Sequence, residues 1–187
     1  MTKHPSLELR RATGADATAV AAVHVASWQV AYRGIVPDEF LDTFDVAERA
    51  RRYTFDDHAP GGHVTWLASE GDVVVGMVTV SPCRDEDLSS FGELQALYVS
   101  PAKWRAGVGA ALITKGEELL VDAGFSSACL WVFEENARAR TFYEVARWRS
   151  DGRTKSIEIA GRQLVEIRYV KKLVPRALDE TTHRSEI

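Results

Sequence analysis

Stretches in which apolar and polar residues alternate, as in strands, are followed along the chain by stretches with the apolar spacing of helices. The points where one pattern replaces the other predict the order of the elements. Residues 7–13 (LELRRAT) alternate apolar and polar positions, which is typical of a half-buried strand. Apolar positions then follow helical spacing, and Asp16 is the expected N-cap of this first helix. The helix should break at Gly34 and restart after Pro37, and a further short helix is expected over 46–55.

The middle of the chain has the pattern of strands followed by a helix. Segments 63–69 and 72–80 are strand-like and are joined by a turn, and 91–99 is a third strand of this group. A helix over 109–124 follows, with Gly124 as its expected C-cap. Five apolar positions should form the buried face of this helix: Leu112, Ile113, Leu119, Leu120 and Ala123.

The last third of the chain is predicted to hold a strand, a helix and a hairpin. Residues 127–133 (SACLWVF) are almost continuously apolar, as expected for a strand buried on both faces. Asn136 is the expected cap of a helix over 137–146. Residues 154–173 have the pattern of a hairpin that turns near Ala160 and Gly161.

Only the segment 93–133 has the strand–helix–strand order that a parallel pair requires. The sequence therefore predicts an α/β fold of the α+β kind, with a mixed, mostly antiparallel sheet flanked by helices and a ligand near the crossover. A single domain is expected over 1–174. Residues 175–187 should form a flexible tail, because they have little to bury.

The balance of charges disfavours some partners and suits others. The 187 residues include 23 Lys and Arg against 27 Asp and Glu, and the formal charge of −4 argues against nucleic acid and suits a cationic small molecule. Cys83 and Cys129 form no CxxC pair and have no zinc-like His spacing, so no metal is expected. The first residues lack the apolar core of a signal peptide and no run approaches the ~18 apolar residues of a membrane span, which predicts a soluble, cytoplasmic protein.

The Gly-Val-Gly turn at 107–109 is the clearest candidate for a binding site. Glycines at a helix entry let backbone N–H groups approach an anion such as a pyrophosphate, although a lone GxG is also a common tight turn. A Walker loop is absent. A dinucleotide fingerprint fits badly, because Leu112 takes the place of its last small residue and seven residues (100–106) separate the turn from the strand.

A third phosphate-binding pattern fits. The stretch LYVSPAKWRAGVGAAL, with Pro101, Gly107 and Gly109 in register, resembles the pyrophosphate loop of the GNAT superfamily of acyl-CoA-dependent N-acyltransferases. Trp104 stands where that motif has Gln or Arg. The later stretch NARARTFYEVARW resembles the family's second motif, with Arg147 in place of its usual Gly. The resemblance spans roughly 7–174.

The resemblance implies acetyl-CoA or CoA as the cosubstrate and no metal. Backbone groups of the loop would cradle the pyrophosphate, and backbone groups of the preceding strand would bind pantetheine, with the Val99 N–H polarising the thioester carbonyl. Lys103 and Arg138 are nearby cations that could meet phosphates or remain solvated surface charges. The cofactor-binding residues implied in this way are Leu97, Val99, Trp104, Arg105, Ala106, Gly107, Val108, Gly109, Ala110, Asn136 and Arg140.

The same resemblance suggests two catalytic residues. Glu93 occupies the position of a family base, and the sequence leaves open whether it acts directly, through water or not at all; His24 is a second candidate. Tyr143, seven residues after Asn136, matches the Tyr that protonates the departing CoA sulfur.

The acceptor side would be formed by the first helix and the loop after it. Trp28 and Tyr32 lie four residues apart and either hold a cation or belong to the core. Arg33 would instead favour an acceptor with a carboxylate.

The sequence thus indicates an N-acetyltransferase that acts on a primary amine of a small molecule or protein by direct attack in a ternary complex. There are two alternatives: a non-catalytic sensor that binds acyl-CoA, and a domain that binds only the phosphates of a nucleotide. The resemblance also leaves a homodimer open, through the hairpin or a sheet edge. The identity of the acceptor is not encoded in these motifs.

Overall fold

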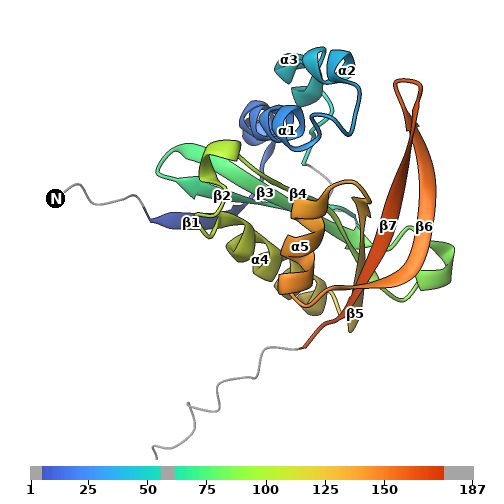
Figure 1. The fold of residues 1–187 in the computed structure, drawn as a ribbon. Coiled ribbons are helices and arrows are strands. Elements are labelled where there is room, and N and C mark those ends of the chain that lie inside the picture. Colours follow the sequence, from blue (N-terminus) through green and yellow to red (C-terminus); the bar gives the residue numbers. More distant parts are fainter. Residues whose placement is uncertain (1–5, 56–61, 175–187) are drawn as a thin grey trace, which may run out of the picture.

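The computed structural model describes residues 6–55 and 62–174 and has, within them, one seven-stranded sheet with helices on both faces (Figure 1). The strands are β1 (Leu7–Arg11), β2 (Val64–Glu70), β3 (Val73–Pro82), β4 (Gly92–Val99), β5 (Ser127–Phe133), β6 (Arg149–Ile159) and β7 (Arg162–Lys172). The helices are α1 (Ala17–Ala31), α2 (Asp38–Asp42), α3 (Val46–Ala50), α4 (Val108–Asp122) and α5 (Ala137–Val145). The predicted tail, 175–187, lies outside the described residues.

The strands follow the order β1-β2-β3-β4-β5-β7-β6 across the sheet. Every neighbouring pair is antiparallel except β4 and β5, which run parallel and are connected through α4. This is the single crossover that the sequence predicted, and the predicted fold class is confirmed.

The parallel pair opens soon after it begins. Gly92 pairs with Ala128 and Glu93 with Cys129, and the ladder between β4 and β5 ends there. On its other side β4 carries a bulge at Gln95, because Val80 of β3 pairs with Leu94 whereas Thr79 pairs with Ala96. A bulge bends its strand and increases the local twist. It therefore turns the rest of β4 away from β5 and leaves a gap between 94–99 and 130–133.

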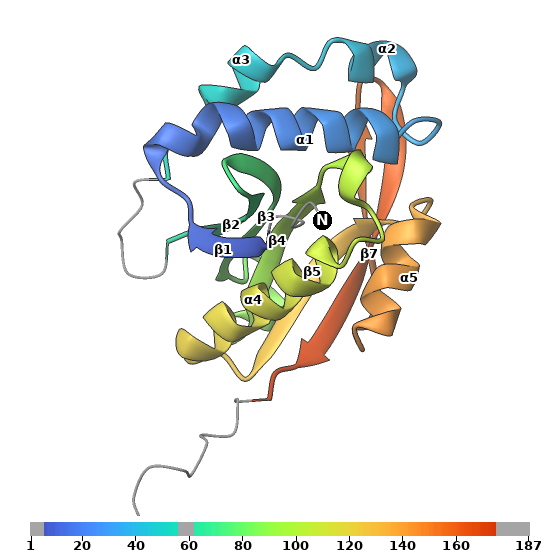
Figure 2. The ribbon, with the colours of Figure 1, turned by 90° about the vertical axis from the view of Figure 1, so that its left-hand side faces the viewer.

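The helices form two layers. Figures 1 and 2 show α1 crossing one face of the sheet, and α4 and α5 on the opposite face. The predicted face of α4 is buried at Leu112, Ile113 and Leu120. Ala123 is exposed, contrary to prediction, because α4 ends at Asp122 and the chain turns away through Gly124, whose φ is 90°.

The two predicted N-caps stand at the predicted positions, but only one makes the capping hydrogen bond; the predicted C-cap, Gly124, lies one residue beyond Ala123, the C-cap of α4. Asn136 caps α5 by accepting a hydrogen bond from the Ala139 N–H. Asp16 stands at the N-cap of α1, but its carboxylate accepts from the Thr13 N–H at 2.9 Å and pairs with Arg10 at 2.6 Å. It therefore stabilises the turn before the helix and not the first helical turn.

The hairpin of β6 and β7 extends from the sheet toward α2 (Figure 1). Its turn uses left-handed backbone at Ala160 and Gly161, as a tight hairpin requires. An apolar cluster joins Leu164 of the hairpin to Leu41 of α2 and to Phe133 at the end of β5. In the two described stretches, no helix has the length and apolar character that a membrane crossing demands.

Candidate active site

A cavity of about 980 Å³ occupies the gap between β4 and β5. Its walls come from β4, β5, the end of α1, the loop before α4, the start of α5 and the β6–β7 hairpin. It therefore lies where the sequence predicted a ligand, beside the one parallel crossover.

The first turn of α4 provides unpaired backbone N–H groups at one end of this cavity. Gly107 is the N-cap of α4 with a left-handed φ of 84°. The Ala111 N–H donates to the Gly107 carbonyl, so the amides of residues 108–110 precede the first helical hydrogen bond. Together with the helix dipole, these amides can bind an anion.

The structure brings most of the predicted loop residues to the cavity. Its lining includes Trp104, Arg105, Gly107, Gly109 and Ala110. Two predicted residues have other positions: the Val108 side chain is buried in the core, and Ala106 is exposed.

Trp104, which stands where the motif has Gln or Arg, contacts both β4 and a cation of α5. Its indole N–H donates to the Val99 carbonyl at 2.9 Å, and the Arg138 guanidinium lies 3.3 Å from the centre of its ring. Burial lowers the pKa of Arg138. The Trp side chain thus fixes the loop to β4 and holds a cation at the cavity wall. Arg138 and Lys103 both line the cavity.

The edge of β4 that faces the gap presents backbone groups to the cavity. The Ser100 N–H donates to Val75 of β3 at 2.9 Å. Successive backbone groups of a strand point to opposite edges, so the N–H groups of Val99 and Leu97 point toward β5. This is the direction that binding an extended ligand between the strands requires.

Tyr143 and Asn136 of the second motif also line the cavity. Tyr143 is buried, and desolvation raises the pKa of its phenol well above the ordinary value, so the hydroxyl stays protonated. Phe142 beside it explains the small residue at position 109, because a Cβ on Gly109 would lie 3.3 Å from the Phe142 ring.

The other end of the cavity is aromatic. Trp28 and Tyr32 line it with their rings nearly perpendicular and 4.8 Å apart between centroids, and Tyr32 packs against Phe133 in the same way. Arg33, predicted with them, lies outside the lining and bonds to Asp42 at 2.9 Å on the surface.

Glu93 is buried at the closed end of the gap and is not among the cavity-lining residues. Arg84 donates to both of its carboxylate oxygens, at 2.6 and 3.0 Å. The role of Glu93 as a base stays a prediction, and this position favours a structural role.

Two further sequence candidates lie outside the cavity lining. The ring of His24 is 2.6 Å from the Tyr53 hydroxyl, and burial lowers its pKa to about 3, so the ring is neutral. Arg140 bonds to the Tyr169 hydroxyl and to the Glu134 carbonyl.

Among the lining residues that sequence reasoning missed are Gln95, Tyr98, Trp131 and Glu166. Glu166 could have been noticed as a carboxylate within the apolar alternation of the predicted hairpin. Trp131 looked like a core residue in an apolar run, and only the opening of the gap turns it toward a cavity.

The architecture defines a class of protein: a sheet whose parallel strands splay beside a helix N-terminus suited to phosphate, as in acyltransferases that use acyl-CoA. The family model of the acetyltransferase (GNAT) family matches residues 26–146. The N-acetyltransferase YuaI of Bacillus subtilis, itself uncharacterised, is 32% identical over 164 residues, which are 85% of this chain and 89% of that protein. The chain belongs to the GNAT acetyltransferase family.

Solved structures share the fold at lower identity. PaiA N-acetyltransferase from Thermoplasma acidophilum, in complex with coenzyme A, aligns with a TM-score of 0.67 and 19% identity over 89% of this chain and 99% of that one. YncA from Salmonella typhimurium, with its cofactor acetyl-CoA, aligns with a TM-score of 0.67 and 18% identity over 94% of this chain and 98% of that one.

Proposed function

We propose that this protein transfers an acetyl group from acetyl-CoA to a primary amine of a small molecule or protein. The observation that carries the proposal is the continuity of the cavity, which joins the unpaired amides in the first turn of α4, the free edge of β4 and the side chain of Tyr143. Two fold relatives are described as holding CoA or acetyl-CoA, which supports the same ligand here.

The residues at the loop end suit an anionic ligand. The amides of residues 108–110 and the side chains of Lys103, Arg105 and Arg138 would hold the pyrophosphate and the outer phosphate. Leu97 and Val99 would hydrogen-bond pantetheine along the edge of β4. Acetyl-CoA supplies the activated acyl group, and the rest of the chemistry depends on how the chain positions the amine.

Direct attack needs few groups from the protein. The amine nitrogen forms a bond to the carbonyl carbon while the carbon–sulfur bond breaks, and the Val99 N–H would stabilise the charge that develops on oxygen. Tyr143 would donate a proton to the departing sulfur. The amine proton would leave through water, because neither Glu93 nor His24 lines the cavity.

Titration calorimetry with CoA, acetyl-CoA and ADP tests the ligand, and release of free thiol with a panel of primary amines tests the reaction. Acetyl-CoA binding well above ADP binding, together with turnover of at least one amine, would support the proposal. Binding without turnover of any amine would favour a sensor. Equal affinity for ADP and CoA would favour a nucleotide-binding domain, and absence of CoA binding would refute the proposal.

A further inference from the structure

Charge is distributed unevenly along the cavity. Its basic lining residues, Lys103, Arg105 and Arg138, come from the loop before α4 and from the start of α5. At the hairpin side lies Glu166, the one carboxylate among the described residues that line the cavity. The acceptor side therefore differs in charge from the side that suits phosphates.

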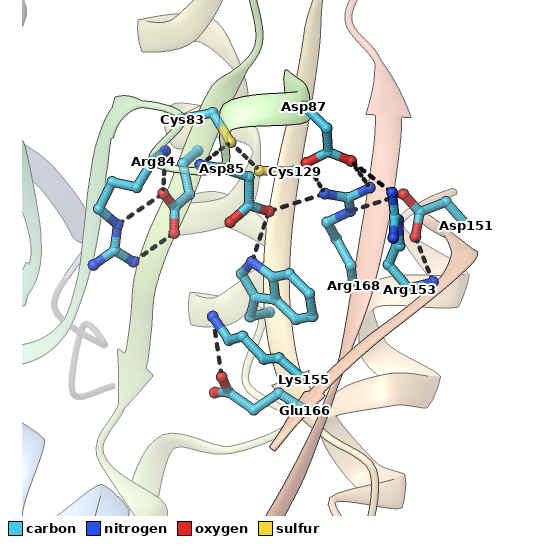
Figure 3. Close-up of polar contacts among 12 residues, drawn as sticks. Cys83, Arg84, Asp85, Asp87, Cys129, Asp151, Arg153, Lys155, Glu166 and Arg168 are labelled. Atoms are coloured by element: carbon cyan, nitrogen blue, oxygen red, sulfur yellow. Dashed lines mark hydrogen bonds and ion pairs between the residues drawn. The ribbon is translucent and has the colours of Figure 1, made fainter. Parts of the chain in front are cut away.

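A cation of the protein itself already pairs with Glu166, although it is not among the residues that line the cavity. Lys155 of β6 lies directly across the ladder from Glu166 of β7, and its Nζ is 3.3 Å from a carboxylate oxygen (Figure 3). The same Nζ lies 4.0 Å from the centre of the Trp131 ring. A carboxylate and an indole face together are a strong combination for an ammonium ion.

The orientation of Trp131 is fixed from outside the cavity. Its indole N–H donates to Asp85 at 3.1 Å, and Asp85 accepts a second hydrogen bond from Arg168 at 3.0 Å. Arg168 is buried and is also bonded to Asp87 and Asp151 (Figure 3). This network holds the indole in place whether or not Lys155 lies over it, so the site is preorganised for a cation.

Apolar residues near Trp131 and Glu166 suit the alkyl chain of a ligand that has a charged group at each end. Phe133, Ile157 and Ile159 line the same cavity and project from the sheet face that also carries Trp131 and Glu166, because their positions differ by even numbers or are paired across the ladders. Apolar walls exclude water and strengthen attraction between charges within the cavity.

We infer that Trp131 and Glu166 bind a second cationic group of the acceptor, which displaces Lys155, so that the preferred substrates are alkyl diamines or other amines with a distant positive charge. The Lys155 side chain is 40% exposed, so it can move into water when a ligand enters. The inference rests on the proposed function in one respect: the acceptor amine must enter the cavity at the end formed by Trp28 and Tyr32.

The test compares 1,4-diaminobutane with n-butylamine, which share the reacting amine and the length of the chain. Binding of each to the CoA-saturated protein is measured by calorimetry, and turnover is measured separately by thiol release. The variants are Glu166→Gln, which removes the carboxylate charge, and Lys155→Met, which removes the internal cation. Glu158→Gln on the same hairpin is the matched control, because Glu158 lies outside the cavity and bonds to Gln163.

The wild-type protein should bind the diamine more tightly than the monoamine. Glu166→Gln should weaken diamine binding by about tenfold and leave monoamine binding nearly unchanged. Lys155→Met should tighten diamine binding by about threefold, because the competing ammonium is gone. Glu158→Gln should match the wild type for both amines.

Equal binding of the two amines, no effect of Glu166→Gln, or weaker diamine binding in Lys155→Met would each overturn the inference. Absence of amine binding would overturn it as well. The proposed function fails independently: diamine binding that depends on Glu166 without turnover would leave this site standing and refute catalysis. Equal turnover of monoamines and diamines would support catalysis and overturn the assignment of Trp131 and Glu166 as a cation site.

Discussion

Arg84 and Glu93 form an ion pair that links the surface to the closed end of the β4–β5 gap. The Glu93 side chain is 3% exposed and that of Arg84 is 65% exposed, and the two are joined by two hydrogen bonds between guanidinium and carboxylate. The backbone N–H of Arg84 donates to the same carboxylate at 3.2 Å. Glu93 thus fastens the chain after β3 to the start of β4.

Glu93→Gln and Arg84→Gln separate this structural role from catalysis. If the pair is structural, each variant should lower the free energy of unfolding by about 1–3 kcal/mol and leave kcat within about tenfold of the wild type. Urea unfolding and thiol release measure the two effects. A general base contributes about 10²–10⁴-fold. A folded Glu93→Gln protein that loses activity to this extent while Arg84→Gln keeps it would identify Glu93 as the base.

Tyr143→Phe tests the proposed proton donor. Because burial raises the pKa of this phenol, the hydroxyl should remain protonated throughout the pH range in which the protein is folded. We expect kcat to fall by about 10²-fold with little change in KM for acetyl-CoA, since the ring that packs in the cavity is kept.

Tyr169→Phe is the matched control for this experiment. Tyr169 is buried close to Tyr143 but lies outside the cavity lining, where its hydroxyl donates to Glu144 at 2.8 Å. Its variant should keep kcat near the wild-type value. Equal loss of activity in both variants would point to a packing effect and would contradict proton donation by Tyr143.

The fold and one half of the site were predictable because they depend on local patterns. The crossover at 93–133 was readable from hydrophobic period and order, and the loop at 104–110 and the helix after Asn136 carry short motifs with fixed spacing. Helical spacing alone places Trp28 of α1 and Tyr32 at its C-cap on one face, and both line the cavity; their role toward an acceptor stays a prediction.

The other half of the site depends on contacts between distant parts of the chain. Trp131 and Glu166 face the cavity because the bulge at Gln95 opens the sheet. The sequences of β5 and β7 contain no pattern from which a bulge in β4 could be predicted. Arg84 reaches Glu93 through the conformation of the loop between β3 and β4, which hydrophobic period does not determine. Side chains in these places acquire their roles from register and loop geometry.

His24 predicts how stability depends on pH. Burial among aromatic rings lowers the pKa of His24 from its ordinary 6.5 to about 3, so the unfolded chain binds a proton in this interval that the folded chain does not. The contribution of His24 is therefore fully present above pH 6.5 and is lost as the pH falls, with a slope of up to about 1.4 kcal/mol per pH unit. Urea unfolding from about pH 7.5 to about pH 5 measures this slope.

Two comparisons isolate the His24 effect. Arg10 holds the pKa of Asp16 far below its ordinary 3.8, so the stabilisation from Asp16 is lost only when the pH falls below that value. His63, which is exposed, provides the control variant His63→Gln, and the slope should persist in it. His24→Gln should remove most of the slope. A His24 pKa near 6.5 by NMR titration would contradict the burial argument.

Cys83 and Cys129 predict a response to oxidation. Their sulfur atoms are 3.0 Å apart although 46 positions separate them in the chain, and both are free thiols (Figure 3). Burial raises the pKa of Cys129, whereas Cys83 is partly exposed and is the thiol that a reagent should meet first. Diamide, a two-electron oxidant, would take two electrons and two protons from the pair and join the sulfurs in a disulfide.

This crosslink would close a loop between the end of β3 and the start of β5, beside Glu93. Closing a loop of this size should raise the free energy of unfolding by about 2–4 kcal/mol. Mass spectrometry of tryptic peptides should find the intramolecular link, and dithiothreitol should reverse both effects. Cys83→Ser should show neither the link nor the gain in stability. Two outcomes would show that the sulfurs do not meet in solution as they do in the structure. One is the formation of dimers joined by disulfides, and the other is two thiols that still react with a thiol reagent when the protein is unfolded after diamide treatment.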